Sequence, residues 1–193
     1  MPNSAKLLIV SCSLNPQSRS AVLCQALHVV AESLGAQVDF VDLRTLDLPQ
    51  CDGKAAYGAE AVGPMAQRIR EADAIVLGVP IYNYDVNAAA KNLLELTGQA
   101  WTGKVVGFCC AAGGQGSFMS VLGLANSLML DYRCLILPRY VYATGAAFER
   151  GADGAHTLVD AEVRGRVERL ARAILALGSA VTPLQLEHAD DPD

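Results

Sequence analysis

Four serines and an arginine lie within one ten-residue segment near the start of the chain, residues 11–20, SCSLNPQSRS. The serines are Ser11, Ser13, Ser18 and Ser20. Their hydroxyls can donate hydrogen bonds to phosphate oxygens, and Arg19 supplies a full positive charge. The segment joins an aliphatic run to a helical pattern, so its backbone N–H groups and the positive end of the helix dipole point toward a ligand. We expect a phosphate-binding loop here, which we call the serine loop; the alternative is a helix cap followed by an ordinary polar loop.

The serine loop lacks the glycines of the common nucleotide-binding motifs. No GxGxxG follows the first aliphatic run, which disfavours a dinucleotide, and the chain has no GxxxxGK[ST], which disfavours an NTPase. A hydroxyl-rich loop without these glycines suits a terminal monophosphate, because side chains can surround it. Flavin mononucleotide (FMN) carries such a phosphate.

Two further segments suit a flat heteroaromatic ring. PIYNYD, residues 80–85, offers two tyrosine rings and the amide of Asn83. AAGGQGS, residues 111–117, contains glycines that permit positive φ and let backbone N–H groups approach the polar edge of a ring. These glycines are Gly113, Gly114 and Gly116. Each segment alone is also typical of an ordinary turn, but three such loops at one edge of a sheet would favour a ligand site.

The elements that must position these loops alternate along the chain. Continuous apolar runs predict buried parallel strands at 7–10, 74–79, 105–110 and 135–137, the last stopped by Pro138, and the apolar residues within 38–43 predict a further short strand. Helical patterns are found near 20–34, 65–71, 88–96, 122–130 and 163–177. We therefore predict an α/β fold of three layers, with a doubly wound, five-stranded parallel sheet of order 2-1-3-4-5. The loops after strands one, three and four then lie side by side at the carboxyl rim, where such sheets bind ligands.

Length and charge limit the other possibilities. The 193 residues suffice for one core, and we expect a single domain over residues 1–180 and a polar, acidic tail over 181–193. The net charge of −5 disfavours nucleic acid and anionic membranes as partners. No apolar run reaches the ~20 residues of a membrane span, and no signal peptide is recognisable, so we expect a cytoplasmic protein. The 52% hydrophobic content and the apolar helix at 88–96 predict a homodimer or homotetramer.

Cysteine and histidine provide no metal site in this sequence. The six cysteines form no C-x-x-C, no metal-ligand spacing occurs, and we expect most of them to be buried thiols. Cys12 is the exception, because its place near a helix N-terminus should lower its thiol pKa. None of the histidines falls in the three loops, so we expect no catalytic side chain; they are His28, His156 and His188.

Together these motifs resemble the NAD(P)H-dependent FMN reductases of the flavodoxin-like superfamily. The resemblance runs over about residues 6–137 and consists of SxSxxxxSxS in the serine loop, PIYNY followed by a helix with Lys91 and Asn92, and GGxGS at 113–117. It implies that the FMN phosphate is held by Ser11, Ser13, Ser18, Arg19 and Ser20. It also implies that Pro80, Ile81, Tyr82 and Asn83 flank the isoalloxazine, with Gly113, Gly114 and Gly116 beneath its polar edge.

The resemblance further implies an activity. NADPH or NADH would give a hydride to bound FMN, which would pass electrons to free flavin, a quinone or a similar small-molecule acceptor. Many members carry an arginine where Asn15 stands, so the charge of this loop differs. One alternative is a flavodoxin-type electron carrier, whose phosphate loop would be rich in threonine and glycine. A receiver-like signalling domain would need an acidic cluster after the first strand, where Ser11 and Cys12 stand.

Overall fold

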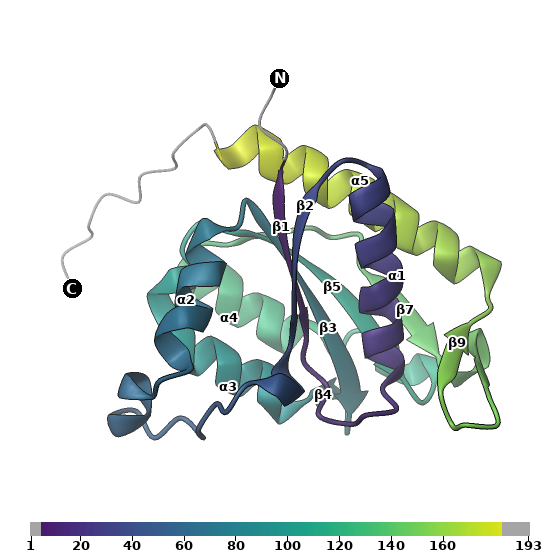
Figure 1. The fold of residues 1–193 in the computed structure, drawn as a ribbon, viewed down its shortest axis with the longest axis horizontal. Coiled ribbons are helices and arrows are strands. Elements are labelled where there is room, and N and C mark those ends of the chain that lie inside the picture. Colours follow the sequence, from purple (N-terminus) through teal and green to yellow (C-terminus); the bar gives the residue numbers. More distant parts are fainter. Residues whose placement is uncertain (1–4, 183–193) are drawn as a thin grey trace.

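The computed structural model describes residues 5–182, which form a central parallel sheet between two layers of helices (Figure 1). Its main strands are β1 (Lys6–Ser11), β2 (Gln37–Asp42), β3 (Ala74–Tyr82), β5 (Val105–Ala112), β6 (Leu135–Ile136) and β7 (Val141–Thr144). The order is β2-β1-β3-β5-β6, β7 also pairs with β5, and all these pairings are parallel. The predicted order 2-1-3-4-5 is confirmed, because β5 is the fourth main strand and β6 and β7 share the fifth position.

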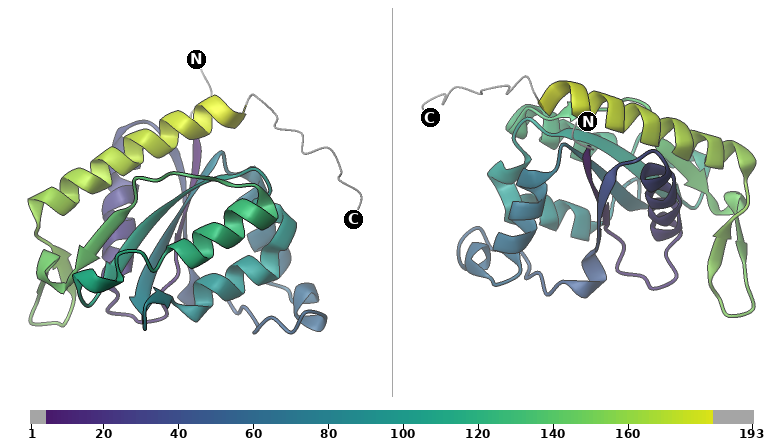
Figure 2. Two further views of the ribbon diagram at one scale, coloured as in Figure 1. Left: turned by 180° about the vertical axis from the view of Figure 1, so that it is seen from behind. Right: turned by 45° about the horizontal axis from the view of Figure 1, so that its top comes forward.

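Helices cover both faces of the sheet, as Figures 1 and 2 show. They are α1 (Arg19–Ser33), α2 (Val62–Glu71), α3 (Ala88–Thr97), α4 (Leu122–Tyr132) and α5 (Ala161–Val181). Helices α1 and α5 pack on one face of the sheet, and α2, α3 and α4 pack on the other. Alternate residues of β1 enter the two cores: Leu8 and Val10 face α2 to α4, and Leu7 and Ile9 face α1 and α5. This two-sided burial explains why the strand is continuously apolar.

The strand predicted at 135–137 is β6 and ends before Pro138 as expected, but a second segment continues the fifth position of the sheet. Proline has no N–H for a sheet ladder, so β6 stops before it, but the chain returns as β7 beside the end of β5. Two further pairings were not predicted. Strand β4 (Asp85–Val86) folds back antiparallel on β3, and β8 (Phe148–Arg150) pairs with β9 (His156–Leu158) in a separate hairpin, which we call the arm.

The structure removes one reason for expecting an oligomer. The apolar helix predicted at 88–96 is α3, and its larger apolar residues pack inside the chain, whereas Ala88 is exposed and Ala89 half-buried; the buried apolar residues are Ala90, Leu93, Leu94 and Leu96. The acidic tail predicted over 181–193 lies outside the described residues, apart from Val181 and Thr182 at the end of α5. Among the helices of residues 5–182, none has the length and hydropathy that a membrane span requires.

Candidate functional site

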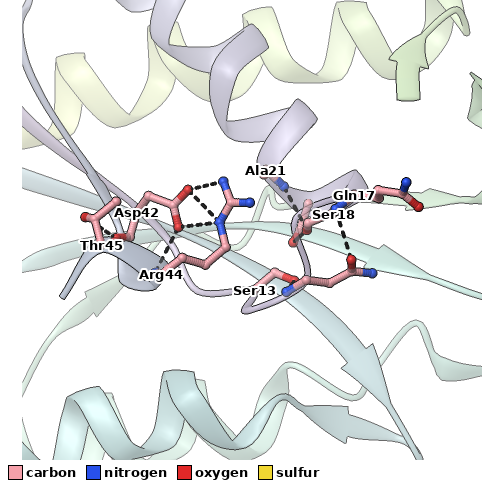
Figure 3. A network of polar contacts seen from close by, with 9 residues as sticks. Ser13, Gln17, Ser18, Ala21, Asp42, Arg44 and Thr45 are labelled. Atoms are coloured by element: carbon pink, nitrogen blue, oxygen red, sulfur yellow. Dashed lines mark hydrogen bonds and ion pairs between the residues drawn. The ribbon is translucent and has the colours of Figure 1, made fainter. Parts of the chain in front are cut away.

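The serine loop ends in a helix cap. Ser18 is the N-cap of α1, and its Oγ accepts a hydrogen bond from the backbone N–H of Ala21 at 3.2 Å (Figure 3). The hydroxyl of Ser20 lies 2.9 Å from the same Oγ. A serine oxygen can accept two hydrogen bonds and donate one. When Ser20 donates to Ser18, the proton of Ser18 is free for a ligand, so capping and ligand binding are compatible.

The start of α1 offers two further donors. The N–H groups of Ala21 and Val22 bond to Ser18, whereas no hydrogen bond within residues 5–182 uses those of Arg19 and Ser20. The side chain of Arg19 lies against Gly145, where an added Cβ would come 2.5 Å from Nη1. Gly145 therefore leaves the room that Arg19 occupies, and the first turn of α1 combines a charge with free N–H groups.

The serine loop also shapes itself with its own side chains. The N–H of Asn15 donates to Ser13 Oγ at 3.3 Å, and the N–H of Gln17 donates to Asn15 Oδ1 at 2.9 Å (Figure 3). Figure 3 also shows the neighbouring end of β2, where Asp42 pairs with Arg44. That pair neutralises a carboxylate near the loop, and the hydrogen bonds from Arg44 outweigh burial and hold the pKa of Asp42 below its usual value.

The second loop is a tight hairpin between β3 and β4. Tyr82 pairs with Asp85, and the two residues between them, Asn83 and Tyr84, have φ of 51° and 63°. Positive φ at both central residues is the pattern of a type I′ turn. A tyrosine rarely adopts this conformation, and such backbone strain is often found at functional sites.

Asn87 joins this hairpin to the serine loop. Its backbone N–H donates to the carbonyl of Pro80 at 3.1 Å, and its side-chain Nδ2 donates to the carbonyl of Cys12 at 2.7 Å. The side chain is buried, and its Oδ1 has no hydrogen-bond partner among the described residues. Asn87 was not singled out by the sequence, because it lies in a short link with no recognisable motif.

The glycine loop, residues 111–117, leaves open space where side chains would stand. A Cβ built on Gly113 or Gly114 meets no atom within 4 Å. Neither residue has positive φ, so the expected left-handed conformation is wrong. Tyr142 holds the loop from β7: its hydroxyl donates to the carbonyl of Gly114 at 2.5 Å and lies 2.8 Å from Ser117 Oγ.

The three loops meet around one cavity of about 830 Å³. The predicted residues that line it are Ser13, Ser18, Arg19, Ser20, Pro80, Ile81, Tyr82, Asn83 and Gly113. A second cavity of about 310 Å³ shares three of these residues and adds Tyr84, Gly114 and Gly116. Ser11 lines neither; it is fully buried, and its hydroxyl has no partner among the described residues.

Several lining residues of the larger cavity were missed by the sequence analysis. They are Asn15, Gln17, Ala111, Ala112, Arg150 and His156. The last two come from the arm, so His156 lines the cavity although it lies outside the three loops. A signal for the arm was present, since Asp153 and Gly154 form a DG pair, a common hairpin turn, but the flanking strands are only three residues each.

The cysteines are mostly core residues, as predicted, since all but the half-buried Cys51 are buried. The expectation for Cys12 is wrong. Burial, together with Cys24 and Asp42 nearby, raises its thiol pKa well above the ordinary value. Burial thus outweighs the helix dipole at this position. Within residues 5–182, no group of three His, Cys, Asp or Glu residues could hold a metal ion.

The Lys91–Asn92 pair of α3 has structural contacts. Lys91 Nζ lies 3.7 Å from a Glu95 carboxylate oxygen at the surface, the ion pair that helical spacing permits. Asn92 accepts a hydrogen bond from the N–H of Cys51 at 2.8 Å and donates to the carbonyl of Pro49 at 2.9 Å. It therefore holds the long loop after β2 in place.

Comparisons with known proteins agree with this geometry. The sequence matches the family described as NADPH-dependent FMN reductase across residues 5–149. It is 30% identical over 171 residues to an NAD(P)H-dependent FAD/FMN reductase of Geobacillus thermodenitrificans, covering 86% of this chain and 89% of that protein. A probable NADPH:quinone oxidoreductase 1 of Oryza sativa is 31% identical over 173 residues, 85% of each chain.

The fold is also similar to solved structures. The flavoenzyme NAD(P)H:(acceptor) oxidoreductase FerB from Paracoccus denitrificans has a TM-score of 0.73 and 21% identity, covering 92% of this chain and 98% of that one. An NADH:FMN oxidoreductase in its apo form has a TM-score of 0.71 and 13% identity, covering 90% and 89%. At these identities, the likeness establishes the flavodoxin-like fold.

Proposed function

The chain belongs to the NADPH-dependent FMN reductase family, and from that membership we propose that its two rim cavities form a single FMN site. It is an NAD(P)H-dependent flavin reductase with FMN as cofactor. The observation that carries the proposed site is the cavity of about 830 Å³, where the serine loop, the tyrosine hairpin and the glycine loop meet. This volume lies within the ~300–1,000 Å³ typical of cofactor sites.

The serine-loop end fits a phosphate. Ser13, Ser18 and Ser20 line the cavity, and the first turn of α1 adds two free N–H groups and the charge of Arg19. A helix N-terminus with hydroxyl and guanidinium donors is a strong anion site. We propose that these residues hold the FMN phosphate. Ser11 is buried outside the cavity, and we therefore leave it out of the proposed contacts.

The other end fits a flat ring. Pro80, Ile81, Tyr82 and Asn83 line one side of the cavity, and Gly113 lines both cavities. The open space over Gly113 and Gly114 is space that any larger residue would fill. We propose that the isoalloxazine lies there, with the backbone of Gly113, Gly114 and Gly116 at its polar edge.

When bound, FMN supplies the redox chemistry, taking a hydride from a reduced nicotinamide and passing electrons to an acceptor. The chain's own residues bind and orient the flavin, and this chemistry needs no protein acid or base. We accordingly propose no catalytic side chain. Tyr82 and Tyr84 line the cavities yet are 53% and 74% exposed, so they border the mouth through which a nicotinamide or a small acceptor would enter.

We also propose that the chain forms a homodimer or homotetramer, now for a different reason. Large apolar side chains are exposed along the segment 118–130: Phe118, Met119, Leu122, Met129 and Leu130. Such a patch is typical of an interface. Light scattering of the purified protein should give at least twice the chain mass of 20.3 kDa, and the chain mass itself would remove this proposal.

A flavin-bleaching experiment tests the function. The purified protein is mixed with FMN, freed of unbound flavin and treated with NADPH or NADH without oxygen. A reductase loses its visible flavin absorbance, regains it with a quinone or free flavin, and repeats the cycle. A flavodoxin-type electron carrier would retain FMN but would not bleach with either nicotinamide, and that result would contradict the proposal.

A further inference from the structure

The arm turns two basic residues toward the flavin cavity. Strands β8 and β9 pair outside the central sheet, beside the α1 end of the molecule (Figures 1 and 2). Phe148 is paired with Leu158, and both are buried in the core under α1 and α5. Arg150 lies two residues after Phe148 and is paired with His156. Because alternate residues of a strand point to the same face, the side chains of Arg150 and His156 lie on the inward face of the arm, as Phe148 does. Both line the larger cavity.

Contacts with Gln17 fasten the arm to the serine loop. Arg150 Nη2 donates to Gln17 Oε1 at 3.2 Å. At the hairpin turn, a Cβ added to Gly154 would come 2.6 Å from Gln17 Nε2, so the absence of a side chain at Gly154 lets the turn pack against this amide. Gly154 also has φ of +83°, which suits glycine. Gln17 immediately precedes Ser18, and Arg150 is thereby held beside the phosphate end of the cavity.

The charges around this cavity have one sign. Among the described residues that line it, the charged ones are Arg19 and Arg150, and there is no aspartate or glutamate, although the chain as a whole carries a net charge of −5. His156 packs edge-on against Phe148 at 6.4 Å between ring centroids. Its Nδ1 is buried and has no hydrogen-bond partner among the described residues. A buried ring nitrogen without a partner is costly unless a ligand satisfies it.

We propose that Arg150 and His156 form a second wall of the site and bind a phosphate monoester dianion. This inference rests on the proposed flavin site. Two molecules could supply this phosphate: FMN, which the link through Gln17 to Ser18 favours, and NADPH, through its 2′-phosphate. The match to the reductase family ends at residue 149, so both residues lie beyond it.

Binding titrations of the flavin-free protein test the wall. FMN and riboflavin affinities are measured by flavin fluorescence for the parent, Arg150→Gln, His156→Gln and the double variant. We expect each single change to weaken FMN binding by about threefold to tenfold and to leave riboflavin binding unchanged. This loss lies between the contribution of an exposed ion pair and that of a full charge-assisted hydrogen bond. The loss should shrink in high salt. Glu149→Gln, on the outward face of the same strand, is the control and should bind both flavins like the parent.

A second measurement separates the two phosphate sources. If FMN affinity is unchanged but the KM for NADPH rises while that for NADH does not, the wall recognises the nicotinamide phosphate, which still supports the proposal. Equal losses for FMN and riboflavin, or no change for FMN and NADPH, would overturn it. The parent protein tests the proposed flavin site separately. If the parent does not bind FMN, both the flavin site and the wall are wrong. If the parent binds FMN and the variants bind FMN and NADPH equally well, only the wall is refuted.

Discussion

The two ends of the rim cavity are built in opposite ways. At the serine loop the site consists of groups that are present: hydroxyls, N–H donors and the guanidinium of Arg19. At the glycine loop it consists of side chains that are missing, because Gly113 and Gly114 face open space. The serine-loop end should therefore determine which flavin binds, since FMN has a phosphate and riboflavin does not. The glycine-loop end should determine whether any flavin fits. Substitutions at the two ends should therefore fail in different ways.

The largest effect is expected at the glycine loop. Gly114→Val places a branched side chain in the space proposed for the ring, while the absence of any atom within 4 Å of the new Cβ leaves the fold intact. We predict a folded, soluble variant that retains neither FMN nor riboflavin and does not oxidise NAD(P)H. Circular dichroism and flavin titration check this. Gly63→Val, the same exchange at an exposed position of α2 with equally open space, should bind both flavins normally.

At the opposite end, Arg19→Ala should discriminate between flavins. Loss of a charged donor should weaken FMN binding by about 1.5–3 kcal/mol and change riboflavin binding little. Parallel titrations by fluorescence measure both. Arg172→Ala removes an exposed ion pair with Glu168 on α5 and serves as the matched control. If Arg19→Ala weakens both flavins equally, the phosphate is not at α1.

Ser18 combines the two roles of the serine loop, and two variants separate them. Ser18→Ala removes the cap of α1 and should lower the free energy of unfolding by about 1 kcal/mol, with some loss of FMN affinity. Ser18→Asp retains a capping oxygen but adds a negative charge at the proposed phosphate. It should keep its stability in urea denaturation and lose FMN selectively. Normal FMN binding by Ser18→Asp would argue against this placement.

The smallest effect concerns the strained turn beside the ring end. Tyr84 is held at φ of 63° although its side chain is mostly exposed. Tyr84→Gly should relieve that conformation and raise the free energy of unfolding by about 0.5–1 kcal/mol, because glycine adopts positive φ without a steric penalty. Tyr84→Ala removes the same ring but keeps a Cβ, so it should show no such gain. Equal stabilities of the two variants would mean that the turn is not strained.

Local patterns predicted most of the sheet and the three loops, because β1, β3 and β5 consist almost entirely of apolar residues and each loop directly follows one of them. The arm was missed because its three-residue strands contain Glu149, Arg150 and His156, which show no apolar pattern, and its place beside Gln17 depends on contacts 133 residues apart in sequence. Ser11 and Cys12 show the same limit. The sequence placed them in a polar loop, whereas the end of β1 buries both, and burial decides what their side chains can do.

We propose above all that the rim cavity selects FMN through its phosphate. Titrating the flavin-free parent with FMN and with riboflavin, which share the ring and differ by the phosphate, tests it most directly. The predicted result is tighter binding of FMN by on the order of 10- to 150-fold, equivalent to about 1.5–3 kcal/mol, with the preference reduced in Arg19→Ala. Equal affinities for the two flavins would contradict the claim.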